Sequence, residues 1–250
     1  MRDWKSVVAG ALGGAFLAVV IVFAAARQGW LPVAGTASGG VNIRGYLLGH
    51  PELLAEMTER LQAQQEATDK VKAADAMKKI GMAAFFDPRI AFISGPADAK
   101  KTVVEFYDFN CPYCRLSLPA VEKYYQAHQN DTRFSFILFP IRGPDSVLAA
   151  RAALAAREQP GKYMAFYSTL MKEEEPVNEA MIYADAQKAG LNLAKLKVDM
   201  ANPEIDAAIA ASKALATRAG IDGTPTFIVN GVMHPGAVDD DTLKSLAAES

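Results

Sequence analysis

From residue 90 onward, the spacing of the apolar residues alternates between that of a strand and that of a helix. Residues 102–109 are rich in β-branched and aromatic side chains, which predicts a buried strand. Residues 115–128 carry apolar side chains at helical spacing, and residues 133–139 predict the next strand. A short strand is also expected over residues 90–94, after a turn at residues 85–88. Residues 90–139 are therefore predicted to form a strand, a second strand, a helix and a third strand, in that order.

A long alanine-rich stretch from about residue 146 to residue 219 predicts a block of helices, broken at its prolines and glycines. Residues 226–229 predict a further strand, and Asn230-Gly231 is a strong hairpin signal leading into Val232-Met233. Three acidic residues, 239–241, suit the N-cap and first turn of a last helix ending near residue 248.

The N-terminal pattern is different. Residues 7–26 are twenty uncharged residues preceded by Arg2 and Lys5, long enough to span a hydrocarbon core of about 30 Å as a helix. The run is longer than the usual apolar region of a cleavable signal, which favours an uncleaved membrane anchor. Three alanines before Arg27 also suit signal cleavage, so a signal segment is the alternative. Both interpretations place the rest of the chain outside the cytoplasm.

Residues 27–42 form a small-residue linker, and residues 51–81 predict one long helix. Leu47, Leu54 and Leu61 recur every seven residues, which is a partial heptad pattern. We interpret residues 43–82 as an oligomerisation stalk, the alternative being a helix that lies on the catalytic domain. The catalytic domain is then expected over residues 83–250, with its helical insertion at about 146–219.

The composition limits the class of protein. The formal net charge is −2 and the pI is near 6.0, which gives no reason to expect a nucleic-acid partner. Hydrophobic residues make up 51% and charged residues 22% of the chain, enough for one well-packed domain with an added segment.

The chain has only two cysteines, Cys111 and Cys114, separated by Pro112 and Tyr113. They lie at the predicted strand-to-helix junction, where unpaired N–H groups and the helix dipole favour an anion and lower the pKa of Cys111. A bridge across so short a loop removes little chain entropy, so its value is chemical. The spacing therefore predicts a redox-active disulfide.

A zinc half-site is the alternative interpretation of the same cysteines. Such a site needs two further Cys or His ligands. The chain has no other cysteine, and its histidines are scattered singly: His50, His128 and His234. We therefore expect no resident metal, and Cu(I) at Cys111 and Cys114 is the one metal interaction considered.

Glu105 lies six residues before Cys111 on the predicted central strand. Its aromatic neighbours should desolvate the carboxylate and raise its pKa. The alternative is a strand-end acid paired with Lys100 or Lys101.

Two segments resemble the signatures of the DsbA-like thiol–disulfide oxidoreductases: residues 105–114 (EFYDFNCPYC) and residues 223–227 (GTPTF). The resemblance covers about residues 83–248. It implies an α/β thioredoxin fold with an inserted helical domain. The predicted helical stalk and the anchor or signal segment precede this domain. Residues 46–54 (YLLGHPELL) resemble the suppressor-of-copper-sensitivity protein C (ScsC) branch of that family.

The resemblance also implies roles for the site residues. Cys111 would be the attacking thiolate and the more exposed thiol, and Cys114 would resolve the mixed disulfide. Glu105 would move a proton for Cys114. Thr224 and Pro225 would form a cis-proline loop that faces Cys111 and pairs with an extended client peptide. Pro112 and Tyr113 would tune the redox potential.

We thus expect an exported, periplasmic oxidoreductase, anchored in the inner membrane if residues 7–26 are retained. A disulfide isomerase or reductase linked to copper tolerance is favoured. The alternatives are a monomeric dithiol oxidase and a Cu(I)-binding protein that uses the same thiols. The expected partners are exported client proteins with cysteines, a membrane redox partner that recycles the pair, and further copies of the chain, a trimer by resemblance. No cofactor besides the redox-active disulfide is expected.

Overall fold

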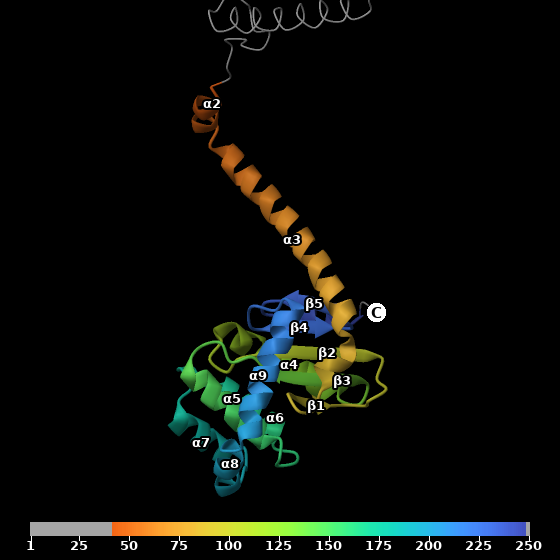
Figure 1. Ribbon diagram of the computed structural model, residues 1–250, viewed down its shortest axis with the longest axis vertical. Helices are drawn as coiled ribbons and strands as arrows, with labels where there is room; N and C mark the ends of the chain where they lie inside the picture. Colours follow the sequence, from red (N-terminus) through yellow and green to blue (C-terminus); the bar gives the residue numbers. More distant parts are fainter. Residues whose placement is uncertain (1–41, 249–250) are drawn as a thin grey trace, which may run out of the picture. The chain divides into compact units, whose positions relative to one another are not determined.

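The computed structural model describes residues 42–248 (Figure 1). The predicted anchor or signal segment, residues 1–26, and the linker up to residue 41 lie outside the described residues. The chain divides into two units between Ala63 and Gln64. The domain limits given by the sequence stay predictions.

Two helices precede the sheet. Helix α2 (Ile43–Gly49) is capped by the Asn42 side chain, which accepts a hydrogen bond from the Gly45 N–H at 2.8 Å. Helix α3 (Glu52–Ile80) covers the predicted long helix, and Gly81 ends it with a φ of +76° that suits glycine. The break between α2 and α3 was not predicted. Among the described residues, no helix is long and apolar enough to cross a membrane.

A five-stranded sheet with the order β1-β3-β2-β4-β5 forms the centre of the second unit. Strand β2 pairs in parallel with β3, and the other pairs are antiparallel. The strands are β1 (Ala91–Ser94), β2 (Lys101–Tyr107), β3 (Thr132–Leu138), β4 (Thr226–Val229) and β5 (Val232–Pro235). Every strand was predicted to within two residues at each end.

Strand β2 ends two residues earlier than predicted. The Asp108 carboxylate accepts a hydrogen bond from the Asn110 N–H at 2.8 Å, which turns the chain before the redox helix. At the other hairpin, Asn230 and Gly231 both have positive φ values, +50° and +85°. The predicted two-residue turn between β4 and β5 is therefore present.

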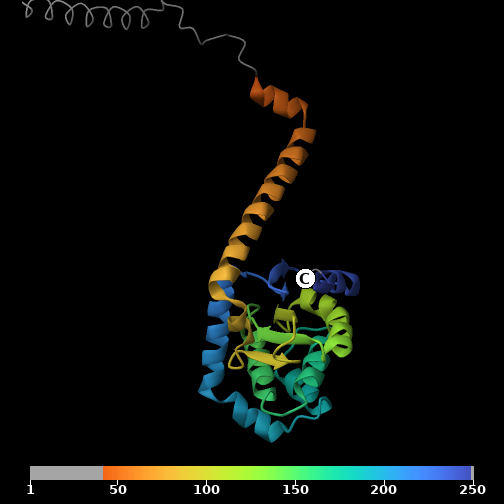
Figure 2. The same cartoon turned by 90° about the vertical axis from the view of Figure 1, so that its right-hand side faces the viewer.

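Helices cover both faces of the sheet (Figure 2). Helices α4 (Pro112–His128) and α10 (Asp240–Ala248) pack on each other on one face, and α9 (Pro203–Ala219) lies on the other face. A 3-10 helix, η1 (Met82–Phe86), which was not predicted, begins three residues before the turn expected at residues 85–88. The remaining inserted helices are α5 (Pro144–Ala156), α6 (Tyr163–Met171), α7 (Glu179–Lys188) and α8 (Leu193–Met200). The predicted fold, a thioredoxin-like sheet with a helical insertion, is confirmed.

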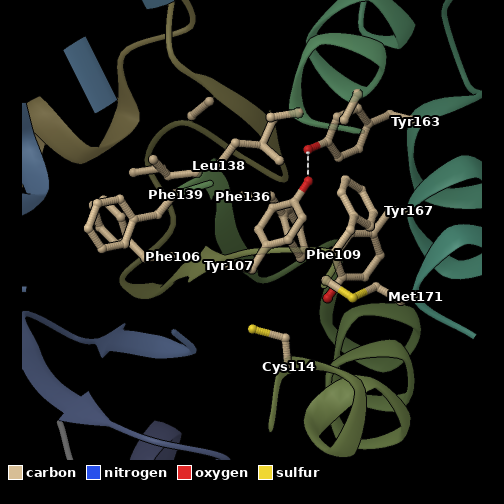
Figure 3. Close-up of a cluster of buried hydrophobic side chains, with 14 of the residues drawn as sticks. Phe106, Tyr107, Phe109, Cys114, Phe136, Leu138, Phe139, Tyr163, Tyr167 and Met171 are labelled. Atoms are coloured by element: carbon tan, nitrogen blue, oxygen red, sulfur yellow. Dashed lines mark hydrogen bonds between the residues drawn. The ribbon is translucent and has the colours of Figure 1, made fainter. Parts of the chain in front are cut away.

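The core on the insertion side of the sheet is aromatic (Figure 3). The ring of Tyr107 packs edge-on against those of Phe109 and Tyr167, with centroids 5.2 and 5.1 Å apart. The Tyr107 and Tyr163 hydroxyls form a buried hydrogen bond of 2.6 Å. Helix α6 therefore contributes its side chains to the same core that surrounds Cys114.

Candidate active site

The two cysteines lie at the start of helix α4. Cys111 is the N-cap residue, Pro112 occupies the first turn, and Cys114 lies one turn into the helix. The Cys111 N–H donates to the Asp108 carbonyl at 3.0 Å, which fixes the backbone just before the helix. Both cysteines are free thiols. The predicted position of Cys111 at the helix N-terminus is confirmed.

Cys111 faces the Thr224–Pro225 loop. The peptide bond between Thr224 and Pro225 is cis, and the Cys111 sulfur lies 3.0 Å from the Thr224 carbonyl oxygen, which accepts a hydrogen bond from the protonated thiol. The sheet explains this contact, because β2 and β4 pair antiparallel and so bring the end of β2 to the start of β4. The structure thus joins two segments more than a hundred residues apart, as the resemblance implied.

The surroundings of Cys111 lower the pKa of its thiol to about 5. The largest cause is a hydrogen bond from the Cys114 thiol. Burial opposes the shift, and hydrogen bonds from the Thr224 side chain and from the backbone N–H groups of Cys114 and Tyr113 add to it. The direction agrees with the prediction from the helix N-terminus, but the neighbouring thiol contributes more than the backbone.

Cys111 was expected to be the more exposed thiol of the pair, but both thiols are almost completely buried. The exposed fraction of Cys111 is 1%, and that of Cys114 is 0%. The contact with the Thr224 carbonyl explains part of this burial, because the loop lies against the sulfur. Around it, Tyr113 and Leu116 are 58% and 68% exposed. The two thiols therefore differ in their hydrogen-bond partners and not in their exposure.

Cys114 has the opposite ionisation to Cys111. Burial raises the pKa of its thiol far above the usual range, and the hydrogen bond to Cys111 and the nearby charge of Glu105 act in the same direction. The pair therefore combines a thiolate at Cys111 with a neutral thiol at Cys114.

Glu105 is buried on β2, with an exposed fraction of 1%. Burial raises the pKa of its carboxyl to about 8, against an opposing hydrogen bond from Tyr167 and with a smaller contribution from the charge of Cys111. The alternative, an ion pair with Lys100 or Lys101, is wrong: among residues 42–248 Glu105 bonds to Tyr167, and Lys101 pairs with Asp131 at 3.7 Å. Glu105 is thus a largely protonated acid at neutral pH.

Asp108 was not identified from the sequence. Its carboxylate is 1% exposed and accepts three backbone N–H bonds, from Asn110, Ile141 and Arg142, at 2.8, 2.9 and 3.1 Å. It therefore ties the loop before Cys111 to the loop that follows β3. The sequence signal that could have identified Asp108 is an acidic residue between two aromatic residues, Tyr107 and Phe109, at the end of a predicted strand.

A second connection joins the redox helix to the insertion. Arg115 donates to the carbonyl oxygens of Glu174 and Glu175 at 2.9 and 3.0 Å. The Asn110 side chain accepts from the Val177 N–H at 2.7 Å. These contacts fix the segment after α6 against the start of α4. Sequence reasoning missed them because they join residues about sixty positions apart.

The described residues hold no group of three or more His, Cys, Asp or Glu side chains arranged to bind a metal ion. Of the residues expected in the site, the structure places Cys111, Cys114, Pro112, Tyr113, Glu105, Thr224 and Pro225 around the start of α4.

Comparisons with known families match both parts of the chain. The DSBA-like thioredoxin domain matches residues 102–248, which is more than half of the chain. The copper resistance protein ScsC N-terminal domain matches residues 42–68.

Solved structures give the same result. A thioredoxin-like oxidoreductase from Silicibacter pomeroyi is 40% identical, with a TM-score of 0.62, covering 67% of this chain and 96% of that one. BcfH from Salmonella enterica Typhimurium is 28% identical, with a TM-score of 0.70, covering 86% and 96%. Proteus mirabilis ScsC, in a transitional conformation, is 27% identical, with a TM-score of 0.63, covering 88% and 98%.

Curated relatives include the Na(+)/H(+) antiporter NhaA 3 of Salinispora tropica, 31% identical over 161 residues. This match covers 64% of the chain and 24% of the antiporter, so the chain spans about a quarter of that relative's length. The likeness therefore concerns one part of the antiporter. By its family match, its fold and its thiol pair, the chain belongs to the DSBA-like thioredoxin domain family and is a thiol–disulfide oxidoreductase of the DsbA and ScsC type.

Proposed function

We propose that the protein is an exported disulfide isomerase or reductase that acts on the cysteines of client proteins. The observation that carries this proposal is the contrast within the pair: Cys111 has a pKa of about 5, whereas burial keeps Cys114 neutral. A thiolate that exists at neutral pH can attack a client disulfide without a separate base.

The first step is attack by the Cys111 thiolate on one sulfur of a client disulfide. The client S–S bond breaks, a Cys111–client disulfide forms, and the second client sulfur leaves as a thiolate. In isomerisation that released thiolate attacks another client disulfide. A further attack by a client thiolate then frees Cys111 as a thiolate again, so the enzyme finishes reduced.

The second route is resolution by Cys114, which completes a reduction. Glu105 as a carboxylate accepts the Cys114 proton, and the Cys114 thiolate attacks the Cys111 sulfur. The Cys111–client bond breaks, the client thiolate leaves with the electron pair, and a Cys111–Cys114 disulfide forms. In the reverse direction Glu105 gives the proton back to the leaving Cys114.

Client peptides are proposed to lie across the Thr224–Pro225 loop in an extended form. The exposed side chains of Tyr113 and Leu116 on α4 supply apolar contacts beside Cys111. Ile141, 44% exposed in the loop held by Asp108, adds a third. An apolar client residue next to its cysteine would suit this surface.

The isomerase direction is favoured by the N-terminal helices. Their apolar side chains are exposed, including Leu54 at 72% and Leu61 at 54%, and association of several copies would cover them. An oligomer, a trimer by family resemblance, would hold one misfolded client near several reduced thiols. A monomeric dithiol oxidase is the competing function, and it has no use for these residues.

A secondary copper function rests on the same thiols. Thiolates are soft ligands that favour Cu(I), and residues 42–68 match a domain described for a copper resistance protein. Binding would displace the Cys114 proton, so copper affinity would rise with pH. A Cys111→Ser, Cys114→Ser double variant should lose Cu(I) binding, and undiminished binding would contradict this copper function.

The periplasm is the proposed location, with residues 7–26 as an inner-membrane anchor. One similar Salmonella enterica protein of solved structure, 35% identical, is described as periplasmic. A membrane redox partner would return the pair to its reduced form. Fractionation of cells with and without residues 7–26 would test the anchor.

The direction of the reaction is tested with two forms of ribonuclease. The full chain should restore activity to ribonuclease with scrambled disulfides, and the repair should require Cys111. Efficient oxidation of fully reduced ribonuclease without repair of the scrambled form would contradict the isomerase proposal and favour the oxidase.

A further inference from the structure

The inserted helix α6 reaches the redox site through Tyr167. This side chain is fully buried, and its hydroxyl donates to Oε2 of Glu105 at 3.0 Å. Glu105 Oε1 is also buried, and within residues 42–248 it has no hydrogen-bond partner. The two oxygens of the Glu105 carboxyl are therefore unequal.

The Tyr167 hydroxyl is separate from the other buried tyrosine pair of this core. Tyr107 and Tyr163 bond to each other at 2.6 Å, and in Figure 3 the Tyr167 hydroxyl points away from them, toward the side where Cys114 lies. A hydroxyl carries only one proton to donate. Tyr167 thus directs that proton to Glu105.

A protonated carboxyl keeps one oxygen as a hydrogen-bond acceptor and carries its proton on the other. Because Tyr167 donates to Oε2, the neutral acid retains this bond when its own proton sits on Oε1. We infer that Tyr167 is a positioning residue for the redox reaction, which holds the Glu105 carboxyl so that Oε1 is the oxygen that exchanges a proton with Cys114. The inference rests on the proposed redox role of the cysteine pair.

The hydrogen bond from Tyr167 to Glu105 also affects the pKa of the Glu105 carboxyl. A donor to a carboxylate stabilises the charged form, and here it acts against burial. Removing it should raise the pKa of Glu105 further, so that less carboxylate is present at neutral pH to accept the Cys114 proton. The ionisable groups close to Glu105 come from three elements: Tyr107 on β2, Cys111 and Cys114 on α4, and Tyr163 and Tyr167 on α6.

The test follows the two steps of thiol exchange in the reduced full chain. The probe is a chromogenic aryl disulfide that releases a coloured thiolate. Attack by Cys111 releases one aryl thiolate and leaves a Cys111–aryl disulfide. Attack by Cys114 on the Cys111 sulfur, after transfer of its proton to Glu105, releases the second. The second phase therefore reports the step that Tyr167 is inferred to assist.

Tyr167→Phe should leave the rate of the first phase near that of the wild type. It should raise the pH midpoint of the second phase by about one unit, which makes resolution about tenfold slower near neutral pH. At alkaline pH its second phase should match or exceed the wild-type rate. A residue that only fills the core would slow the reaction equally at every pH.

Tyr163→Phe is the matched control, since Tyr163 is also on α6, is 2% exposed and bonds through its hydroxyl, but to Tyr107. Its second-phase midpoint should equal that of the wild type. Fluorotyrosine at position 167, a stronger donor of nearly the same shape, should move the midpoint to lower pH, and it keeps the test valid if the Phe variant does not fold.

Equal second-phase profiles for the wild type, Tyr167→Phe and the fluorotyrosine protein would overturn the inference while leaving the redox pair intact. If the proposed redox function is wrong, the wild type itself will release no second aryl thiolate. That result would also overturn the inferred role of Tyr167.

Discussion

The redox site and the first two helices use apolar residues in opposite ways. Around α4, both cysteines and Glu105 are at most 1% exposed: burial keeps Cys114 and Glu105 neutral, whereas hydrogen bonds, first of all from Cys114, keep Cys111 ionised. On α2 and the first turns of α3, Leu47, Leu54 and Leu61 are 44%, 72% and 54% exposed. Burial in the first region tunes the ionisation of the site, whereas the second region exposes apolar surface that the proposed oligomer would cover.

Of the substitutions in the redox site, loss of the attacking thiol of Cys111 should reduce thiol-exchange activity the most. Cys111→Ser should abolish thiol exchange, because the neutral Cys114 thiol cannot replace the thiolate. Cys114→Ser should instead accumulate Cys111–client disulfides, seen by non-reducing electrophoresis and mass spectrometry. Trapping through Cys114 in the Cys111→Ser protein would reverse the assignment of the two roles.

The exposed leucines offer the sharpest test of the second region. Leu54→Lys with Leu61→Lys should convert a small oligomer into a monomer, since a charged side chain cannot be buried cheaply at an apolar seam. Light scattering measures the mass, and repair of scrambled ribonuclease should fall severalfold while attack on a small disulfide is kept.

Val198→Lys is the control for this pair of substitutions. Val198 is 73% exposed but lies on α8 of the catalytic unit, so its substitution should change neither mass nor repair. A wild-type protein that is already monomeric would break the comparison between the two regions and favour the oxidase function.

Asp108 tests whether the redox site depends on its supporting loops. Asp108→Ala leaves three backbone N–H groups without their acceptor, which should lower the free energy of unfolding by about 2–4 kcal/mol. Urea unfolding measures the loss. Asp108→Asn, which keeps one acceptor oxygen, should recover part of it, and an unchanged stability in the Ala variant would show that these bonds are replaced by water.

Glu105 should make stability depend on pH. The pKa of its carboxyl is about 8 in the folded protein against a usual 4.5, so between these values only the unfolded chain releases the proton. The wild type should therefore lose stability relative to Glu105→Gln as pH rises from 4.5 to 8, by about 1 kcal/mol per pH unit. Below 4.5 and above 8 the difference should be constant.

Glu174→Gln, at an exposed position, is the control for Glu105→Gln and should give a curve parallel to the wild type. A wild-type curve that ran parallel to that of Glu105→Gln across the whole range would mean that the acid is not protonated in the folded protein.

The strands, the redox helix and the insertion were predictable because each has a local signal: β-branched runs, helical spacing and interrupting prolines. The positions of Cys111 and the Thr224–Pro225 loop followed from two short segments that resemble family signatures. The contacts of Tyr167, Arg115 and Asp108 were not predictable, since each joins elements far apart in sequence and depends on packing. The resemblance placed the Thr224–Pro225 loop opposite Cys111, but how completely the sulfur is buried depends on side-chain packing and was not predicted.

The unequal ionisation of the two thiols is the central claim, and titration of thiolate absorbance in the fully reduced full chain tests it most directly. We predict one thiolate that titrates with a midpoint near pH 5 and is absent from the Cys111→Ser protein. A single midpoint between pH 8 and 9, the range of an ordinary cysteine, or two thiolates formed together, would contradict the account.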